Sequence, residues 1–348
     1  MDKEQLHEIL ETAEETGVSD IHFSVDLPPI FRIDGEITPQ DEYPDLLEKD
    51  LHDIVSIILS EEEQQHLNTQ GEADLAYEVE NVGRYRVNAY SQKGRYSLAL
   101  RSIPTIVPTI DDLGMNDSVK HLAEQRQGLI LVTGPTGSGK STTLAAMIRH
   151  VNETFPKHIV TLEDPIEYVH DHERSIIHQR EIHSDTESFA TGLRAALRQD
   201  PDIVLVGELR DLETIQIAIT AAETGHLVFA TLHTTTAAST INRIIDVFPP
   251  EQQSQIRQQL AATIKGVIAQ RLLRKVGGGR VAATEILVQT PSISNLIRTE
   301  KVHQIQNVLQ TSRSLGMHTM EMDVQRLLNE RIIDIEEAKP FLQSEGEL

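Results

Sequence analysis

One run of residues has the composition and spacing that phosphate binding requires. Residues 134–141 read Gly-Pro-Thr-Gly-Ser-Gly-Lys-Ser, which matches the P-loop pattern at every fixed position. The glycines let the backbone turn tightly and direct N–H groups toward phosphate oxygens, so this run predicts an ATP site. The residues that we expect to contact the nucleotide are Gly134, Pro135, Thr136, Gly137, Ser138, Gly139, Lys140, Ser141 and Thr142.

Three side chains of this run have separate predicted roles. Lys140 can bridge the β- and γ-phosphates, the Ser141 hydroxyl can ligate Mg²⁺, and Thr142 is expected near the α-phosphate. An apolar run at 129–132 predicts a strand before the loop, and 142–150 are helical in pattern after it. The alternative is a glycine-rich turn with an exposed lysine, and the two flanking elements count against it.

A pair of carboxylates follows a second apolar run. Glu163 and Asp164 come directly after 159–162, and Pro165 prevents that strand from continuing. Ligands bind at the carboxyl ends of strands in open α/β sheets. We therefore predict that Glu163 is the general base that polarises the attacking water, and that Asp164 orients water or the metal ion. Taken alone, the cluster is more typical of a helix start.

Another carboxylate follows the apolar run 203–206. Glu208 lies two residues beyond it, and Gly207 occupies the position where a Walker B strand usually has aspartate. We predict that Glu208 acts toward Mg²⁺ through water and that Gly207 leaves room for the close approach of a ligand. The alternative is an ordinary core strand that is followed by an exposed acid.

A histidine and three arginines could complete the site. His233 lies just past the apolar run 227–230, where it could sense or hydrogen-bond the γ-phosphate. Arg84 and Arg86 are two residues apart in a strand pattern and project from one face, and Arg101 precedes a predicted linker. Arginines from a mobile element can stabilise the charge of a transferring phosphoryl group, although the pattern alone is typical of solvated arginines.

The elements that must position these residues fall into two parts. Residues 1–100 combine helical stretches with alternating apolar residues, which predicts a small α+β domain with a mostly antiparallel sheet. Pro104 and Pro108 mark a linker at 101–112. Residues 113–348 begin with short apolar runs that alternate with helical patterns, which predicts an α/β domain with parallel strands, and end in a mainly helical pattern.

Composition limits the class of protein. The 348 residues suffice for two domains, and the absence of cysteine excludes disulfides, iron–sulfur clusters and cysteine-ligated zinc. With 54 acidic and 31 basic residues the formal charge is −23, which argues against nucleic acid as the main partner. We see no secretion signal and no run of ~18 apolar residues, which predicts a cytoplasmic protein.

Taken together, these runs resemble the type II/type IV secretion ATPase superfamily. Four stretches carry the resemblance: GPTGSGKSTT at 134–143, TLEDPIEY at 161–168, DPDIVLVGELRD at 200–211 and GHLVFATLHTT at 225–235. Within the superfamily, residues 19–328 are similar to the twitching-motility ATPases that retract type IV pili. SISNLIRTEK at 292–301 resembles the retraction motif of that branch, although Ser292 and Ser294 depart from its usual Ala and Arg.

The resemblance implies a PAS-like N-terminal domain, a RecA-like P-loop ATPase domain with a helical C-terminal part, and a ring-shaped homohexamer. It implies that Glu163 is the base, that Glu208 is the Walker B acid and that His233 contacts the γ-phosphate. It assigns the stabilisation of phosphoryl charge to three arginines, Arg84, Arg86 and Arg101. It also implies a motor at the cytoplasmic face of the inner membrane, which acts on a platform protein there so that the pilus fibre depolymerises.

Three other functions remain open at this point. A pilus-assembly or type II secretion ATPase keeps the enzyme class, but that branch usually has a longer N-terminal region and a tetracysteine zinc site, so we expect no zinc here. A nucleic-acid translocase would also use a RecA-like ring, and the formal charge of −23 opposes it. A nucleotide-gated binding module without turnover is opposed by the presence of both Glu163 and Glu208.

Overall fold

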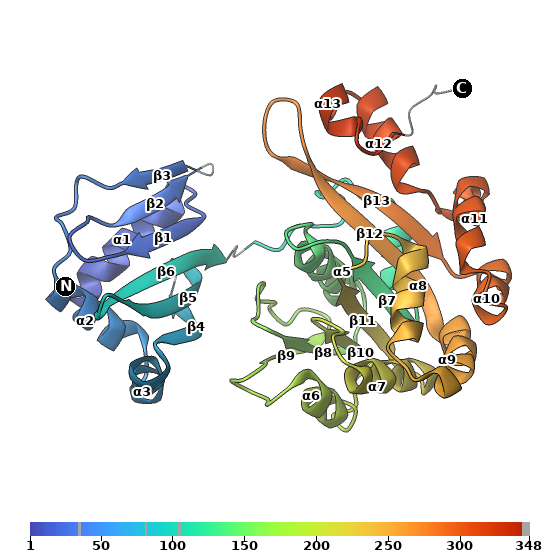
Figure 1. Cartoon of the computed structure of the whole chain (residues 1–348), viewed down its shortest axis with the longest axis horizontal. Coiled ribbons are helices and arrows are strands. Elements are labelled where there is room, and N and C mark those ends of the chain that lie inside the picture. Colours follow the sequence, from blue (N-terminus) through green and yellow to red (C-terminus); the bar gives the residue numbers. More distant parts are fainter. Residues whose placement is uncertain (34–35, 81, 104–105, 343–348) are drawn as a thin grey trace. The chain divides into compact units, whose positions relative to one another are not determined.

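A computed structural model describes residues 1–33, 36–80, 82–103 and 106–342 of the chain (Figure 1). It divides into two compact units, Met1–Ile106 and Val107–Leu348. The division falls inside the predicted linker 101–112. Residues 101–103 of that stretch are the end of a strand, and 104–105 lie outside the described residues.

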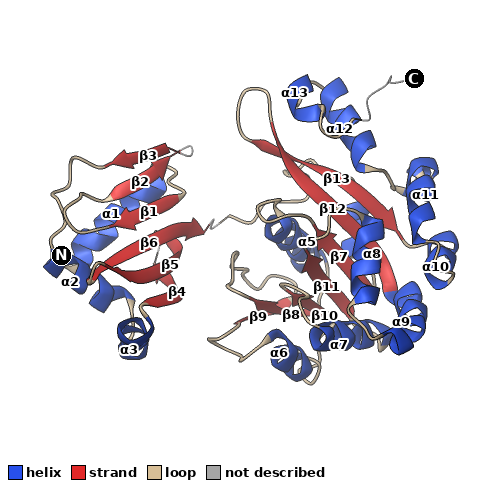
Figure 2. Ribbon diagram, in the orientation of Figure 1, coloured by secondary structure: helices blue, strands red, loops and turns tan. Residues whose placement is uncertain are grey.

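The N-terminal unit is an antiparallel sheet packed against helices. Its strands follow the order β3-β2-β1-β6-β5-β4 (Figure 2). Alternation along β5 buries Tyr85 and Val87 and turns Arg84 and Arg86 to the other face, and the Tyr85 hydroxyl donates to the Leu10 carbonyl over 3.0 Å. The elements are α1 (Lys3–Glu15), β1 (Asp20–Phe23), β2 (Ile30–Ile33), β3 (Glu36–Pro39), α2 (Glu48–Ile58), α3 (Glu61–Gln70), β4 (Glu72–Val79), β5 (Gly83–Gln92) and β6 (Arg95–Ile103).

The C-terminal unit is built on a sheet with the strand order β13-β12-β7-β11-β10-β8-β9, in which only the β12–β13 pair is antiparallel. Its strands are β7 (Gly128–Thr133), β8 (His158–Glu163), β9 (Ile176–Glu181), β10 (Ile203–Val206), β11 (Leu227–Leu232), β12 (Ile264–Arg274) and β13 (Arg280–Val288). Its helices are α4 (Ser118–Ala123), α5 (Lys140–Thr154), α6 (Phe189–Ala196), α7 (Leu212–Glu223), α8 (Ala237–Asp246), α9 (Pro250–Thr263), α10 (Pro291–Arg298), α11 (Ile305–Thr311), α12 (Met320–Asn329) and α13 (Ile335–Ala338).

Helices cover both faces of this sheet, which explains why its central strands are apolar throughout. Along β7, Leu129 and Leu131 join a core with α7, α8 and α9. Ile130 and Val132, which alternate with them, join a second core with α4 and α5. A strand that is buried on both faces shows a continuous apolar run rather than alternation, as residues 129–132 do.

The mainly helical pattern predicted for the end of the chain is wrong at one important element. Residues 264–274 form β12, which lies between β7 and β13. Ile264, Val267 and Ile268 recur at the spacing of a helix face, but each is buried because β12 packs on both faces. Apolar periodicity therefore does not separate a buried strand from a helix here.

The predicted fold class is confirmed: an antiparallel α+β unit is followed by an α/β unit whose central strands are parallel, with helices at the C-terminal end. Parallel strands place the carboxyl ends of β7, β8, β10 and β11 at one edge of the sheet. The predicted functional residues follow these ends. None of the described helices combines the length and apolarity needed to cross a bilayer.

Candidate nucleotide-binding site

The predicted P-loop joins β7 to α5 in a conformation that requires glycine. Gly134, Gly137 and Gly139 have φ angles of 147°, 76° and 85°. A β-carbon at Gly134 would lie 2.4 Å from the Gln270 carbonyl oxygen and 2.5 Å from Ser138 Oγ. The Ser138 hydroxyl is buried without a hydrogen-bond partner. A tight cradle with an unpaired hydroxyl, placed at a helix N-terminus, fits a polyphosphate.

The Lys140 ammonium group lies over this loop. Its Nζ donates to the carbonyl oxygens of Gly134, at 2.9 Å, and Pro135, at 3.1 Å. Burial lowers the pKa of Lys140, while the charges of Glu208 and Glu167 oppose that shift. Lys140 begins α5, whose first N–H groups have no partners within the helix. The positive end of the helix and the ammonium group therefore face the same loop.

A substitution at Gly134 tests whether this cradle binds nucleotide. Gly134→Ala is expected to weaken ADP affinity by about tenfold or more, because the added carbon meets main-chain oxygen and the φ angle is strained. Gly225→Ala is a matched control, since Gly225 also has a positive φ of 114° but open space around it. ADP titration and thermal unfolding of both variants check this expectation. Equal ADP affinity in the two variants would contradict it.

Glu208 is held between two basic side chains. Its Oε2 lies 2.8 Å from a guanidinium nitrogen of Arg210, and its Oε1 lies 3.0 Å from His233 Nε2. Burial alone would raise the pKa of Glu208, but the hydrogen bond and charge of Arg210, together with His233, hold that pKa below its usual range. The structure thus brings together two residues predicted from the sequence: Glu208, as an ionised carboxylate, and His233, whose ring nitrogen contacts it.

Removing Arg210 is expected to change the pH dependence of turnover. In Arg210→Gln the burial effect on Glu208 is no longer offset by the guanidinium, so the pKa of Glu208 rises. If ionised Glu208 is needed, the acid limb of the kcat/KM profile moves to higher pH. Arg194→Gln is the control, because Arg194 pairs with Glu213 outside this cluster. If the kcat/KM profiles of Arg210→Gln and the wild type superimpose, Arg210 does not control the ionisation of a carboxylate that turnover requires.

Glu163 occupies a different environment at the end of β8. Its Oε1 accepts hydrogen bonds from Thr161 Oγ1, at 2.6 Å, and Gln179 Nε2, at 3.2 Å. Burial raises the pKa of Glu163, and the two hydrogen bonds oppose the rise. The environments of Glu163 and Glu208 thus move the two carboxyl pKa values in opposite directions. Such a pair suits a proton-accepting base beside a carboxylate that stays ionised.

The space beside Gly207 is filled by protein, which corrects the expectation that it serves a ligand. A β-carbon at Gly207 would lie 3.1 Å from the Leu162 carbonyl oxygen and 3.4 Å from a ring carbon of Phe189. The Gly207 N–H donates to the same Leu162 oxygen over 2.8 Å, and Thr231 Oγ1 donates to the Gly207 carbonyl. Glycine therefore suits the close packing of β10 against β8 and α6.

The metal ligands predicted from sequence do not form a complete protein site. Asp164 is exposed beside Glu163 and acts electrostatically on Arg210. Among the described residues, no three His, Cys, Asp or Glu side chains lie in an arrangement that could hold a metal ion. Ser141 is exposed at the start of α5. A cation here would need oxygens from the nucleotide, which is the usual situation for Mg²⁺.

The three predicted arginines belong to the N-terminal unit. Arg86 on β5 and Arg101 on β6 are direct partners in register. The Arg101 Nε donates to Asp20 Oδ1 over 2.9 Å, and an Arg84 nitrogen lies 3.8 Å from Glu78 Oε2. Like charges opposite each other on neighbouring strands are unfavourable. The Asp20 carboxylate, which forms an ion pair with Arg101, offsets part of this repulsion.

The chain is similar to known proteins over nearly its whole length. Residues 3–278 match the model of a family described as "Type II/IV secretion system protein". The chain is also 48% identical over 332 residues to the "Type IV pilus retractation ATPase PilT" of Pseudomonas aeruginosa, which covers 95% of this chain and 96% of that protein. The chain belongs to the type II/IV secretion system protein family.

A second relative and a solved structure are also similar to this chain. A "Twitching motility protein" of Neisseria gonorrhoeae is 46% identical over 317 residues, which cover 91% of this chain and 84% of that protein. A crystal structure described as "the Pilus Retraction Motor PilT and Bound ADP" superposes with a TM-score of 0.92 at 48% identity, over 98% of each chain. The match to that solved structure includes both units.

In this type II/IV secretion family member, four side chains that the sequence did not single out contact the predicted residues. Arg210 lies two residues beyond Glu208, so its place in the same run was an available signal. The hydroxyl of Tyr168 lies 3.1 Å from Thr142 Oγ1. Gln179 on β9 and Gln270 on β12 come from other strands, and no local pattern marks them.

Proposed function

We propose that this chain is a Mg-ATP-hydrolysing motor, working as a ring-shaped homohexamer, that powers the retraction of a type IV pilus. The observation that carries the proposal is similarity over nearly the whole chain to a protein named for pilus retraction. The similarity to a protein named for twitching motility, and the superposition on a retraction motor with bound ADP, support the same function.

ATP binding is assigned to the P-loop in this proposal. Lys140 exchanges its two carbonyl partners for β- and γ-phosphate oxygens, and the N–H groups of the loop face the phosphates. The cradle at Gly134 and the unpaired Ser138 hydroxyl support this fit. The candidate residues to hold Mg²⁺ are Ser141, Glu208 acting through water, and Asp164. When bound, the cation neutralises charge on the phosphates.

Hydrolysis is assigned to the two carboxylates and the basic groups around them. Glu163, whose pKa burial raises, accepts the proton of the attacking water. Glu208 stays ionised beside His233, and in this proposal His233 contacts the γ-phosphate. Lys140 and three arginines of the N-terminal unit, from the same or a neighbouring subunit, stabilise the charge of the transferring group. The three are Arg84, Arg86 and Arg101.

The proposal places the motor at the cytoplasmic face of the inner membrane. There it acts on a membrane-embedded platform protein, so that pilus subunits leave the base of the fibre. The linker region near 101–112 is the proposed hinge, because it joins two compact units. Nucleic acid has no part in this mechanism, which agrees with the strongly acidic composition of the chain.

Deleting the gene in a piliated host tests this function. A retraction motor predicts that the mutant keeps abundant surface pili, that these pili no longer shorten, and that twitching stops. Expression of the wild-type chain should restore shortening, and expression of Lys140→Met should not. Loss of surface pili in the deletion mutant would instead identify an assembly ATPase. Intact pilus dynamics together with a defect in protein export would identify a secretion ATPase.

A further inference from the structure

The P-loop contacts a buried amide that no predicted role uses. Gln270 lies in the interior of β12 and its side chain is 1% exposed. Its Nε2 donates to the Ser138 carbonyl oxygen over 2.5 Å, and its Oε1 accepts from Thr143 Oγ1 over 2.9 Å. Both ends of the amide are thus bound to the loop and to the first turn of the helix that follows it.

The bond to Ser138 fixes the direction of an N–H group. A trans peptide is planar, so the carbonyl of one residue and the N–H of the next point in opposite directions. Because Gln270 holds the Ser138 carbonyl toward β12, it turns the Gly139 N–H to the opposite side. An N–H group of this loop can contact phosphate only when it is turned away from the protein that supports it.

Gln270 reaches both ends of the loop. Its main-chain carbonyl oxygen lies 2.4 Å from the position of a β-carbon at Gly134, and its side-chain Nε2 lies 3.3 Å from that position at Gly139. Gly134 opens the loop and Gly139 closes it, immediately before α5. Gln270 therefore lies against both ends of the loop, through its main chain at Gly134 and through its side chain at Gly139.

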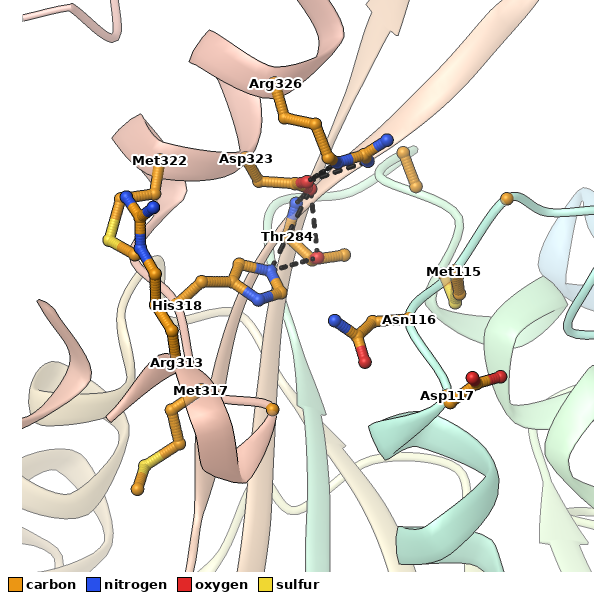
Figure 3. A pocket seen from close by; sticks show the side chains of 13 residues that line it. Met115, Asn116, Asp117, Thr284, Arg313, Met317, His318, Met322, Asp323 and Arg326 are labelled. Atoms are coloured by element: carbon orange, nitrogen blue, oxygen red, sulfur yellow. Dashed lines mark hydrogen bonds and ion pairs between the residues drawn. The ribbon is translucent and has the colours of Figure 1, made fainter. Parts of the chain in front are cut away.

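The direct register partner of Gln270 makes no such contact. Thr284 on β13 is opposite Gln270 and is 4% exposed. Figure 3 shows its hydrogen bonds to Asp323 and His318 at the wall of a cavity of about 590 Å³. The Thr284 N–H also donates to Asp323 Oδ2 over 2.8 Å. Thr284 thus anchors the same pair of strands to α12, while Gln270 binds the P-loop.

We propose that Gln270 is a positioning residue for ATP, which holds the Ser138–Gly139 peptide and Thr143 in the conformation that binds phosphate. The proposal rests on the proposed ATP site. It differs from a purely structural role in one measurable respect. A core amide that only stabilises β12 would change unfolding and leave the affinity of the folded protein for nucleotide unchanged.

Paired isosteric variants separate these two roles. Gln270→Met leaves the Ser138 carbonyl and the Thr143 hydroxyl without their partner, and is expected to weaken ADP affinity about tenfold or more. Thr284→Val removes a buried hydroxyl at the opposite register position and is expected to leave ADP affinity within about twofold. ADP titration of full-length protein, with thermal unfolding without nucleotide, measures both. Equal losses of affinity in the two variants would overturn the proposal.

Gln270→Glu gives a second readout that stability alone does not produce. An ionised carboxylate places oxygen against the Ser138 carbonyl, whereas a protonated one can donate to it. The ADP affinity of this variant, relative to wild type at the same pH, should recover as pH falls. A constant ratio across pH would overturn the proposal even if Gln270→Met does not fold. If the wild-type protein binds no ADP, the proposed ATP site is wrong. That result can be distinguished from a failure of the Gln270 proposal, in which the wild type binds ADP and the variants bind it equally well.

Discussion

Replacing Glu163 with glutamine is expected to lower ATP turnover by roughly 10²- to 10⁴-fold, because the amide cannot accept the proton of the attacking water. Nucleotide affinity should persist, since the side chain contacts Thr161 and Gln179 rather than the P-loop. A glutamine oxygen can still accept both of these hydrogen bonds. Steady-state hydrolysis and ADP titration of the variant measure the two quantities.

The same substitution is expected to stabilise the fold at neutral pH. Burial raises the pKa of Glu163, so the folded state disfavours its charged form. That cost is complete when pH exceeds the raised pKa of the folded state, decreases as pH falls below this value, and is absent below the pKa of the unfolded state, where the carboxyl is neutral in both states. Glu163→Gln should therefore unfold at a higher temperature than wild type at pH 8, with a smaller difference in acid.

An exposed glutamate in the segment between β8 and β9 provides the control for both effects. Glu173→Gln should change neither turnover nor the pH dependence of unfolding, because the side chain of Glu173 is exposed. Full turnover in Glu163→Gln would remove Glu163 from the mechanism. A lower unfolding temperature in that variant at pH 8 would contradict the assignment of a destabilising buried charge.

Replacing Lys140 with methionine is expected to weaken ATP affinity roughly 10- to 100-fold, the usual effect of losing hydrogen bonds from a charged donor. Methionine keeps most of the length of the side chain but carries no donor for phosphate. The protein should remain folded, since burial already disfavours the Lys140 charge by lowering its pKa. Nucleotide titration and hydrolysis assays measure the loss.

Lys157→Met is the matched control for this charge. Lys157 lies just before β8 and forms an ion pair with Asp202 over 2.8 Å, at the opposite end of the strand from Glu163. Its loss should leave ATP affinity unchanged. ATP affinity that falls equally in both variants would show that the effect of Lys140 is one of overall charge and not of contact with phosphate.

The parts of the site that are local in sequence could be predicted from sequence alone. The P-loop can be recognised from sequence because one short run supplies both the turn and the phosphate ligands. Glu163, Glu208 and His233 could be found because each follows an apolar run, and parallel strands bring such carboxyl ends to one edge. The pairing of Glu208 with His233 is a consequence of neighbouring strands β10 and β11.

The parts that depend on tertiary packing could not be predicted in this way. Gln270 is separated from Ser138 by more than a hundred residues, and its strand shows the apolar spacing of a helix. Gly207 marks a close approach correctly, but only the packed structure shows that Leu162 and Phe189 occupy the space. The spacing of apolar residues indicates which residues are buried, but it does not indicate which element packs against them.

The proposed motor function is tested most directly by measuring Mg-ATP hydrolysis on protein that is separated on a sizing column, with its molar mass determined by light scattering. It predicts that the wild type is a hexamer that hydrolyses ATP, and that Glu208→Ala forms the same ring and binds ATP without turnover. A monomer that neither assembles in the presence of Mg-ATP nor hydrolyses it would contradict the account.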